Sequence, residues 1–282
     1  MLNSLFLALQ YIVPQQLLSR FAGRLAESRN PGLKNALIKL FIARFKVDLN
    51  EALISNIHDF ENFNDFFCRA LKPGVRPLEA DERAIVSPAD GCISQLGPIK
   101  SGRIFQAKGQ DYSVTELIGD AELAAQFQNG QFMTVYLSPR DYHRVHMPQK
   151  AALQHMRYIP GRLFSVNEAS AAGIPALFAR NERLVCVFDI DGRPMVMVLV
   201  GAMIVAGIET VWAGHVGPQA GRESTETCYE QSIVLERGEE MGRFKLGSTV
   251  ILLYPEGHSQ WLANLQAGSK VKVRSKIGSW IN

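Results

Sequence analysis

Residues 184–200 read LVCVFDIDGRPMVMVLV, two apolar runs of strand length on either side of Asp191 and Gly192. An Asp-Gly pair between two such runs is typical of the turn that joins two antiparallel strands. The runs are rich in valine, whose β-branched side chain favours an extended backbone. This stretch therefore predicts a β-hairpin.

Similar short runs, separated by proline and glycine, occur along the chain after residue 62. They lie at residues 84–86, 132–137 and 249–254. Only two later stretches are typical of helices: residues 115–127, and residues 167–178, which Gly173 and Pro175 interrupt. Parallel strands need long connections that are usually helical, so this shortage of helices favours antiparallel pairing. We predict an α+β fold in which N-terminal amphipathic helices are followed by a mainly antiparallel β core.

The first 62 residues have a different pattern. Residues 5–9 and 11–13 are apolar, and the stretch ends at Pro14, so it is too short for a transmembrane helix of about 20 residues. Two groups of apolar side chains then recur at helical spacing on either side of Asn30-Pro31-Gly32: Leu17, Leu18, Phe21 and Leu25, and Leu37, Phe41 and Phe45. Basic amphipathic helices of this kind indicate either a surface that lies on an anionic membrane or a helical cap packed on the domain.

Composition excludes several classes of protein. With 47% hydrophobic and 20% charged residues among 282, the chain is neither disordered nor fibrous, and it fits one large domain or a domain with an appendage. A net charge of +3, spread along the chain, argues against a nucleic-acid-binding protein. The cysteines form no C-x-x-C pair, which fits a reducing compartment: Cys68, Cys92, Cys186 and Cys228.

His143 and His146 lie three residues apart, directly after the apolar run 132–137. On an irregular or extended segment this spacing can direct both imidazoles to one site, and imidazole is the side chain best suited to move protons near neutral pH. A metal site needs at least a third ligand, and no cysteine or acidic residue nearby has a recognised zinc-ligand spacing, so we expect no metal. Taken alone, two histidines without a function are the commoner outcome.

Asp90 and Ser248 are further candidates. Asp90 precedes Gly91 in a turn, where aspartate usually serves local hydrogen bonding, but a buried carboxylate there could orient an imidazole. Gly247-Ser248 opens the run 249–254 and is usually read as a turn. The reactive alternative is an attack of the Ser248 hydroxyl on the Gly247 carbonyl, which requires a general base nearby.

Together these segments resemble the phosphatidylserine decarboxylases, in particular the membrane-associated type of proteobacteria. Residues 66–77 are similar to the family signature FF-x-R-x-L-K-P-G-x-R-P. Five further motifs occur in the family's order: SPADG (87–91), YLSPRDYHRVHMP (136–148), FARNER (178–183), ETVWAG (209–214) and EMGRFKLGSTV (240–250). The resemblance extends over residues 63–254, and more loosely over the N-terminal helices.

The resemblance implies a proenzyme that cleaves itself between Gly247 and Ser248 into a β chain, residues 1–247, and an α chain, residues 248–282. Ser248 would attack the preceding carbonyl, His146 would take its proton, and Asp90 would orient that imidazole. Elimination from the resulting ester leaves a dehydroalanine, and hydrolysis with loss of ammonia converts it to a covalent pyruvoyl group. That group would form a Schiff base with the substrate amine and accept electrons as carbon dioxide leaves.

Family analogy assigns His143 to protonation of the decarboxylated adduct. It assigns Ser165 to a hydrogen bond with the adduct, although an ordinary strand-end serine is the alternative reading. The implied substrate is phosphatidylserine and the product phosphatidylethanolamine.

The family also implies a location and an assembly. We expect a peripheral homodimer on the cytoplasmic side of the inner membrane, with residues 1–62 as the membrane-association region and residues 63–282 as the catalytic domain. Basic residues of the helices would lie near anionic headgroups: Lys34, Lys39, Arg44 and Lys46.

Two other functions remain open from the sequence. A pyruvoyl enzyme could act on a soluble amino acid, although the apolar N-terminus argues against it. A non-enzymatic membrane scaffold could keep Gly247-Ser248 as an intact turn, although several motifs in the family's order argue against that.

Overall fold

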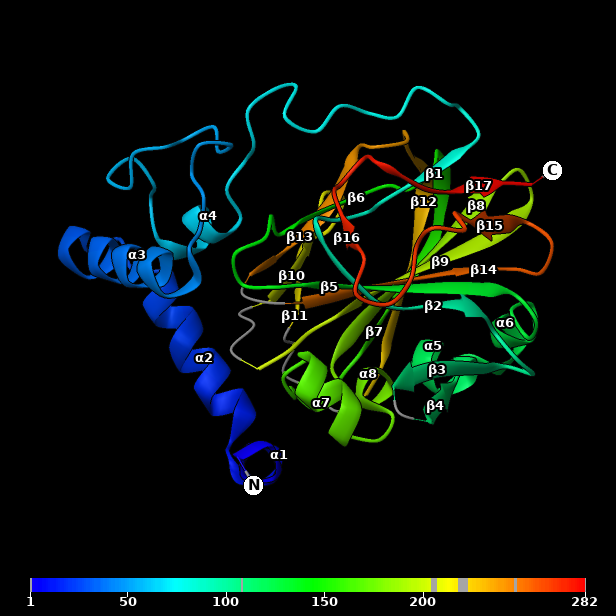
Figure 1. The fold of residues 1–282 in the computed structure, drawn as a ribbon, viewed down its shortest axis with the longest axis horizontal. Helices are drawn as coiled ribbons and strands as arrows, with labels where there is room; N and C mark the ends of the chain where they lie inside the picture. The colour runs from blue at the N-terminus through cyan, green and yellow to red at the C-terminus, as the bar shows by residue number, and fades with distance from the viewer. Residues whose placement is uncertain (1, 108, 204–206, 218–222, 246–247, 282) are drawn as a thin grey trace.

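The computed structural model describes residues 2–107, 109–203, 207–217, 223–245 and 248–281. Its centre is an antiparallel eight-stranded sheet of order β12-β7-β8-β9-β14-β5-β2-β16 (Figure 1). The strands are β2 (Gly91–Pro98), β5 (Gln131–Leu137), β7 (Ala151–Ile159), β8 (Arg183–Ile190), β9 (Arg193–Val200), β12 (Thr225–Leu235), β14 (Ser248–Tyr254) and β16 (Lys270–Val271). The predicted antiparallel β core is confirmed.

The predicted hairpin joins β8 to β9. Ile190 pairs with Arg193, and the two residues between them, Asp191 and Gly192, have φ angles of 50° and 82°. Positive φ at both positions is what a two-residue loop of type I′ requires, because its twist matches that of the strands. The Asp191-Gly192 pair therefore determines where the chain reverses.

Smaller antiparallel sheets surround the central one. One has the order β11 (Gly214–Gly217), β10 (Gly207–Thr210), β13 (Glu240–Lys245) and β6 (Arg144–His146). Another has the order β1 (Ala84–Val86), β17 (Lys276–Trp280) and β15 (Ser259–Trp261), and β3 (Arg103–Ala107) pairs with β4 (Gln110–Ser113).

Strand β14 shows how the central sheet separates two apolar cores. Val250 and Leu252 pack in a core that also contains Phe244 of β13, whereas Ile251 and Leu253 pack in a core with side chains of the short helices. Alternation between the two faces is the ordinary consequence of strand geometry. Every residue of β14 is buried, as expected for a central strand covered on both sides.

The short helices cover the second face and correct one expectation. Residues 115–127 do not form one helix, because Gly119 with a φ of 69° ends α5 (Val114–Ile118) and the Asp120 side chain caps α6 (Ala121–Ala125). The interruption predicted in residues 167–178 is confirmed. It separates α7 (Glu168–Gly173) from α8 (Leu177–Arg180).

The N-terminal helices lie along one side of the β core (Figure 1). They are α1 (Leu2–Ile12), α2 (Gln15–Ala26), α3 (Pro31–Phe45) and the short α4 (Phe63–Phe67). The predicted break at Asn30-Pro31 is confirmed, since the Asn30 side chain caps α3 and accepts a hydrogen bond from the Leu33 amide at 3.1 Å. Phe41 anchors α3, because its ring packs against Phe63 and Phe67 at centroid distances of 5.2 and 5.8 Å.

Helix α2 places its side chains in an unusual way. Leu17 and Phe21 are 64% and 61% exposed, whereas Gln15 and Ser19 are buried. A helical cap packed through its apolar face would show the opposite pattern. In the described part of the chain, no helix is both long enough and apolar enough to cross a membrane.

One basic residue of α3 departs from the expectation that it lies near headgroups. The side chain of Lys34 is buried, and its Nζ donates hydrogen bonds to the carbonyl oxygens of His58 and Phe60 at 2.9 and 2.6 Å. Lys34 therefore fastens α3 to the following loop. Lys39, Arg44 and Lys46 are exposed.

Candidate active site

Strand pairing brings Ser248 to the segment that carries both histidines. Ser248 begins β14 and pairs with Leu137, the last residue of β5, after which the chain continues into residues 138–143. On the other side of the predicted cleavage site, β13 pairs with β6 and places Glu240 opposite His146. Gly247 itself lies outside the described residues. The chain on both sides of this position is thus attached to the histidine segment.

Ser248 is a strand residue and not part of a turn. It is fully buried, and its Oγ has no hydrogen-bond partner among the described residues. A buried hydroxyl without a partner costs about 1–3 kcal/mol, so such a group in a native structure points to a function. The arrangement fits a nucleophile kept away from water.

His143 is a buried, neutral imidazole. Its ring is fully buried and stacks on Phe67 at a centroid distance of 4.0 Å. Its Nε2 lies 3.0 Å from the Ser138 carbonyl oxygen, which can only accept, so Nε2 carries the hydrogen and Nδ1 the lone pair. Nδ1 has no partner among the described residues. Burial, reinforced by the charge of Arg69, lowers the pKa of His143 to about 3.

His146 differs in that both of its nitrogens are engaged. Nδ1 donates to the Gly238 carbonyl oxygen at 2.9 Å, so Nε2 holds the lone pair and accepts from the Tyr142 hydroxyl at 3.1 Å. Burial lowers the pKa of His146 and raises that of Tyr142 to about 12. His146 is therefore neutral at pH 7, as a general base must be, with Tyr142 occupying the basic atom.

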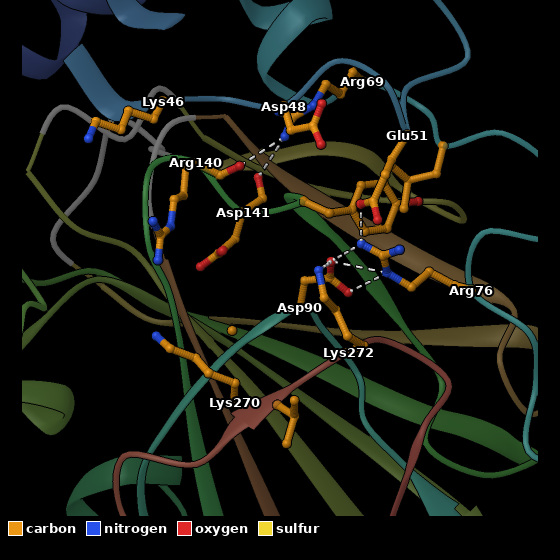
Figure 2. Close-up of a pocket in the computed structure, with 14 residues that line it drawn as sticks. Lys46, Asp48, Glu51, Arg69, Arg76, Asp90, Arg140, Asp141, Lys270 and Lys272 are labelled. Carbon is orange, nitrogen blue, oxygen red and sulfur yellow. Dashed lines mark hydrogen bonds and ion pairs between the residues drawn. The ribbon is translucent and has the colours of Figure 1, made fainter. Parts of the chain in front are cut away.

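Asp90 lies in the turn before β2 and is almost fully buried (Figure 2). Its carboxylate accepts from Arg76 Nη2 at 2.6 Å, from Arg76 Nε at 3.0 Å and from the Val273 amide at 2.8 Å. Lys272 Nζ adds a contact of 3.4 Å. Asp90 is therefore paired with a guanidinium, and within the described part of the chain it forms no hydrogen bond with His146.

The five candidate side chains are thus brought together only in part. Ser248, His143 and His146 belong to paired strands and their connecting loop, and Asp90 precedes β2, which pairs with β5. In the described structure these side chains form no hydrogen bonds with one another, so the triad and the division of labour between the histidines stay predictions. Sequence reasoning missed Arg76 and Tyr142, although both lie within the quoted motifs.

Ser165 lies where the N-terminal helices meet the core. Its backbone amide donates to Gln10 Oε1 at 2.8 Å, and the amide of Leu163 donates to Gln15 Oε1 at 2.8 Å. The sequence feature that could have indicated this attachment is the pair of polar residues Gln10 and Gln15, which lie within and just after the apolar N-terminal stretch. The contact of the Ser165 hydroxyl with an adduct stays a prediction.

Metal ligands and disulfides are absent from the described residues. No group of three or more histidine, cysteine, aspartate or glutamate side chains is placed to hold a metal ion there. All four cysteines are free thiols.

Comparisons with known proteins give the class to which this fold and site belong. A family model described as phosphatidylserine decarboxylase matches residues 63–279, and a second model, described as PSD, matches residues 5–46. The match runs from the start of α4 into β17 and includes every candidate catalytic residue. The chain is a decarboxylase.

The similarity extends over nearly the whole chain. The chain is 56% identical to a phosphatidylserine decarboxylase proenzyme of Alcanivorax borkumensis, over 99% of this chain and 97% of that one. It is 57% identical to the proenzyme of Bordetella avium, over 92% and 89%, and 53% identical to that of Pseudomonas fluorescens, over 99% and 98%. The chain belongs to the phosphatidylserine decarboxylase family, and the resemblance seen in its motifs is confirmed.

Proposed function

We propose that this chain converts phosphatidylserine to phosphatidylethanolamine with a pyruvoyl group made from Ser248, by self-cleavage between Gly247 and Ser248. The observation that carries the proposal is the buried Ser248 hydroxyl at the start of β14, which has no partner among the described residues and lies within the range that the family model matches. Cleavage would give a β chain of residues 1–247 and an α chain of residues 248–282.

We assign the base of the cleavage step to His146. A bond forms between Ser248 Oγ and the Gly247 carbonyl carbon, the peptide C–N bond breaks, and the hydroxyl proton passes through His146 Nε2 to the leaving nitrogen. The lowered pKa of His146 keeps this atom unprotonated at pH 7. Tyr142 must withdraw its hydrogen bond from Nε2 before the transfer.

The orienting role proposed for Asp90 takes a particular form here. The Gly238 carbonyl already holds the His146 tautomer that cleavage requires, with the hydrogen on Nδ1. A direct contact between Asp90 and His146 Nδ1 would require Nδ1 to leave the Gly238 carbonyl oxygen. Asp90 can also act at a distance, because its negative charge opposes the lowering of the His143 pKa.

Once formed, the pyruvoyl ketone would supply an acceptor for the substrate amine and for the electron pair that remains when carbon dioxide leaves. The buried start of β14 fits such a group, because a site without bulk water protects reactive intermediates from side reactions. His143 Nδ1, which holds the lone pair and has no partner among the described residues, would first accept a proton from the substrate ammonium group and then deliver it to the carbon that loses carbon dioxide. Ser165 is proposed as a hydrogen-bond donor to the adduct.

Access to a lipid substrate would come from the N-terminal region, residues 1–62. Its exposed apolar side chains include Ile12, Leu17, Phe21 and Leu40, at 80%, 64%, 61% and 70% exposure. Helices of this kind bind in the interface of a membrane without spanning it, and Lys39 and Arg44 would face anionic headgroups. We place the protein, as a homodimer, peripherally on the cytoplasmic side of the inner membrane.

The decisive test is the intact mass of the purified protein under denaturing conditions, with and without phenylhydrazine as a carbonyl trap. We expect two chains split at Gly247-Ser248, with the small chain taking up the trap. Ser248→Ala should stay uncleaved and unreactive. Thr249→Val is the matched control, because it removes the neighbouring buried hydroxyl, also unpartnered among the described residues, and should cleave normally.

Assays with different substrates distinguish phosphatidylserine from the soluble amino-acid substrate that the sequence left open. Release of carbon dioxide from phosphatidylserine in detergent micelles, with none from phosphoserine or free amino acids, is the expected result. Turnover of the soluble compounds instead would favour a soluble substrate. An intact, trap-resistant wild-type chain after prolonged incubation at raised pH would contradict the self-processing mechanism.

A further inference from the structure

A cavity of about 340 Å³ lies where the end of α3, the turn before β2 and the short strand β16 meet (Figure 2). This volume is within the range of about 300–1,000 Å³ that small-molecule sites occupy. The charged residues that line the cavity are Lys46, Asp48, Glu51, Arg69, Arg76, Asp90, Arg140, Asp141, Lys270 and Lys272. Cations outnumber anions in this lining.

The acidic side chains of the cavity all have partners. Arg76 binds both Asp90 and Glu51, at 2.6 Å in each case. The Asp141 carboxylate accepts from the amide and hydroxyl of Ser138 at 2.8 and 2.7 Å, and the Asp48 carboxylate accepts from the Asn50 amide at 2.8 Å. None of these four carboxylates pairs with Lys46, Arg140 or Lys270, the three exposed basic residues that remain in the lining.

Those three cations lie along the opposite side of the cavity, as Figure 2 shows for Lys46, Arg140 and Lys270. Of the residues that the structure describes, none accepts a hydrogen bond or forms an ion pair with these side chains. They come from three separate segments: the C-terminal end of α3, the loop after β5, and β16. Like charges gathered without counterions repel one another, so this arrangement favours an anionic ligand.

A buried arginine supports the same reading. Arg69 is 5% exposed and lines the cavity, and its Nη2 donates to the carbonyl oxygens of Arg140 and Asp141 at 2.9 and 3.4 Å. Its Nε and Nη1 have no partner among the described residues. A buried guanidinium is costly unless it is paired, and here it both positions the Arg140 loop and adds unneutralised positive charge.

We propose that this cavity binds the phosphodiester of the phospholipid headgroup through Lys46, Arg140 and Lys270. The proposal rests on the proposed function for the lipid nature of the ligand, whereas the anion site rests on the cavity itself. Arginine and lysine donate charge-assisted hydrogen bonds to phosphate oxygens, which are among the strongest that proteins form. The headgroup would reach the cavity at the end of α3, the helix proposed to lie on the membrane.

The sheet register places this site within reach of Ser248. Lys270 pairs with Cys92, Cys92 with Tyr136, and Tyr136 with Thr249. Three strand spacings separate Lys270 from Thr249, or about 14 Å between backbones. A lysine side chain and a phosphoserine headgroup laid end to end span this separation, so a phosphate in the cavity would leave the amine near the start of β14.

The test compares Arg140→Gln and Lys270→Gln with Lys100→Gln, which removes an exposed lysine elsewhere on the β core. All three should be fully cleaved, as judged by intact mass. With dihexanoyl phosphatidylserine below its micelle concentration, we expect a KM about tenfold higher for each cavity variant, or about 1.4 kcal/mol, with kcat within twofold. Lys100→Gln should match the wild type, and an unchanged KM in both cavity variants would overturn the proposal.

Calorimetry with glycerophosphoserine measures the site without turnover, so it remains informative even if the wild type proves inactive on phosphatidylserine. Binding should weaken about tenfold in the cavity variants, and equal binding to wild type and variants would overturn the proposal. Inorganic phosphate bound as tightly as glycerophosphoserine would overturn the lipid headgroup as the source of the phosphate. Weaker flotation with phosphatidylglycerol vesicles, at unchanged KM, would instead assign the cations to general membrane attraction and overturn the headgroup site.

Discussion

The start of β14 and the surface of the N-terminal helices depart from ordinary burial in opposite directions. Ser248 Oγ in β14 and His143 Nδ1 in the segment after the paired strand β5 are buried polar atoms without partners among the described residues. On α2, Leu17 and Phe21 are apolar side chains more than half exposed. Both arrangements cost free energy in the isolated chain, which indicates that each serves something other than folding. Buried polar groups without partners are suited to catalysis, and exposed apolar side chains are suited to binding a membrane.

Removal of the proposed cleavage base should have the largest effect. We expect His146→Ala to remain a single uncleaved chain, because no other group would take the Ser248 proton. Intact mass after purification measures this, and His155→Ala provides a control in a half-buried histidine of β7. Normal cleavage of His146→Ala would remove His146 from the mechanism.

Removal of the other histidine should separate processing from turnover. His143→Ala is expected to cleave yet to decarboxylate about 10²–10⁴-fold more slowly, the usual contribution of a proton-transfer group. Because His143 is fully buried against Phe67, His143→Gln should be measured beside it, together with the Tm of both. If the two histidine variants behaved identically, the division of labour between them would be wrong.

Substitution of exposed apolar side chains on α2 should weaken membrane binding without lowering the stability of the protein. The double substitution Leu17→Gln with Phe21→Gln removes two exposed apolar side chains, each worth about 1.5–3 kcal/mol when buried. We therefore expect flotation with anionic vesicles to fall about 100-fold while the free energy of unfolding changes by less than about 1 kcal/mol. Val234→Gln, at an exposed apolar position of β12, should leave flotation unchanged.

By contrast, Leu252→Ala in β14 should cost about 2–5 kcal/mol of unfolding free energy, because Leu252 is fully buried. Urea denaturation of both proteins at one pH gives this comparison directly. Equal stability losses from the helix and strand substitutions would mean that the α2 side chains are part of a core.

The smallest effect concerns pH. The folded-state pKa of His143, about 3, lies below its unfolded value, so the unfolded chain binds more protons as the pH falls below about 6.5. Its contribution to stability is complete above that pH and declines as the pH falls toward 3, by about 1.4 kcal/mol per pH unit. Wild type should therefore lose more stability than His143→Gln between pH 6.5 and 5.5 in urea denaturation. Parallel losses in the two proteins would contradict a buried neutral imidazole.

Central strands could be predicted from the sequence, whereas an edge strand and the bounds of the short helices could not. Residues 249–254 and 195–200 are continuous apolar runs because their strands are covered on both faces. The edge strand β12 is largely polar and exposed, so no apolar pattern indicated it. The helix expected at residues 115–127 is two helices because Gly119 adopts a left-handed backbone, which glycine allows without requiring it.

The site shows a similar limit. Motifs identified the chemically important residue types, but the partner of each depends on long-range packing. Asp90 could be expected to orient a histidine, yet the loop that follows α4 delivers Arg76 to its carboxylate. Lys34 resembled other surface lysines, yet two carbonyl oxygens of the next loop bury it. Charge and spacing do not reveal such pairings, because they are decided by segments far apart in sequence.

The position of β14 between β5 and β9 affects both the retention of the cleaved fragment and the stage of folding at which cleavage can occur. Cleavage before Ser248 would leave the short fragment threaded through the middle of the sheet, held by backbone hydrogen bonds on both sides and by two apolar cores. The fragment could not dissociate or be exchanged unless the central sheet unfolded. A polypeptide that misfolds would never assemble the surroundings that break its own backbone, so the prosthetic group would appear only in molecules that have already folded correctly.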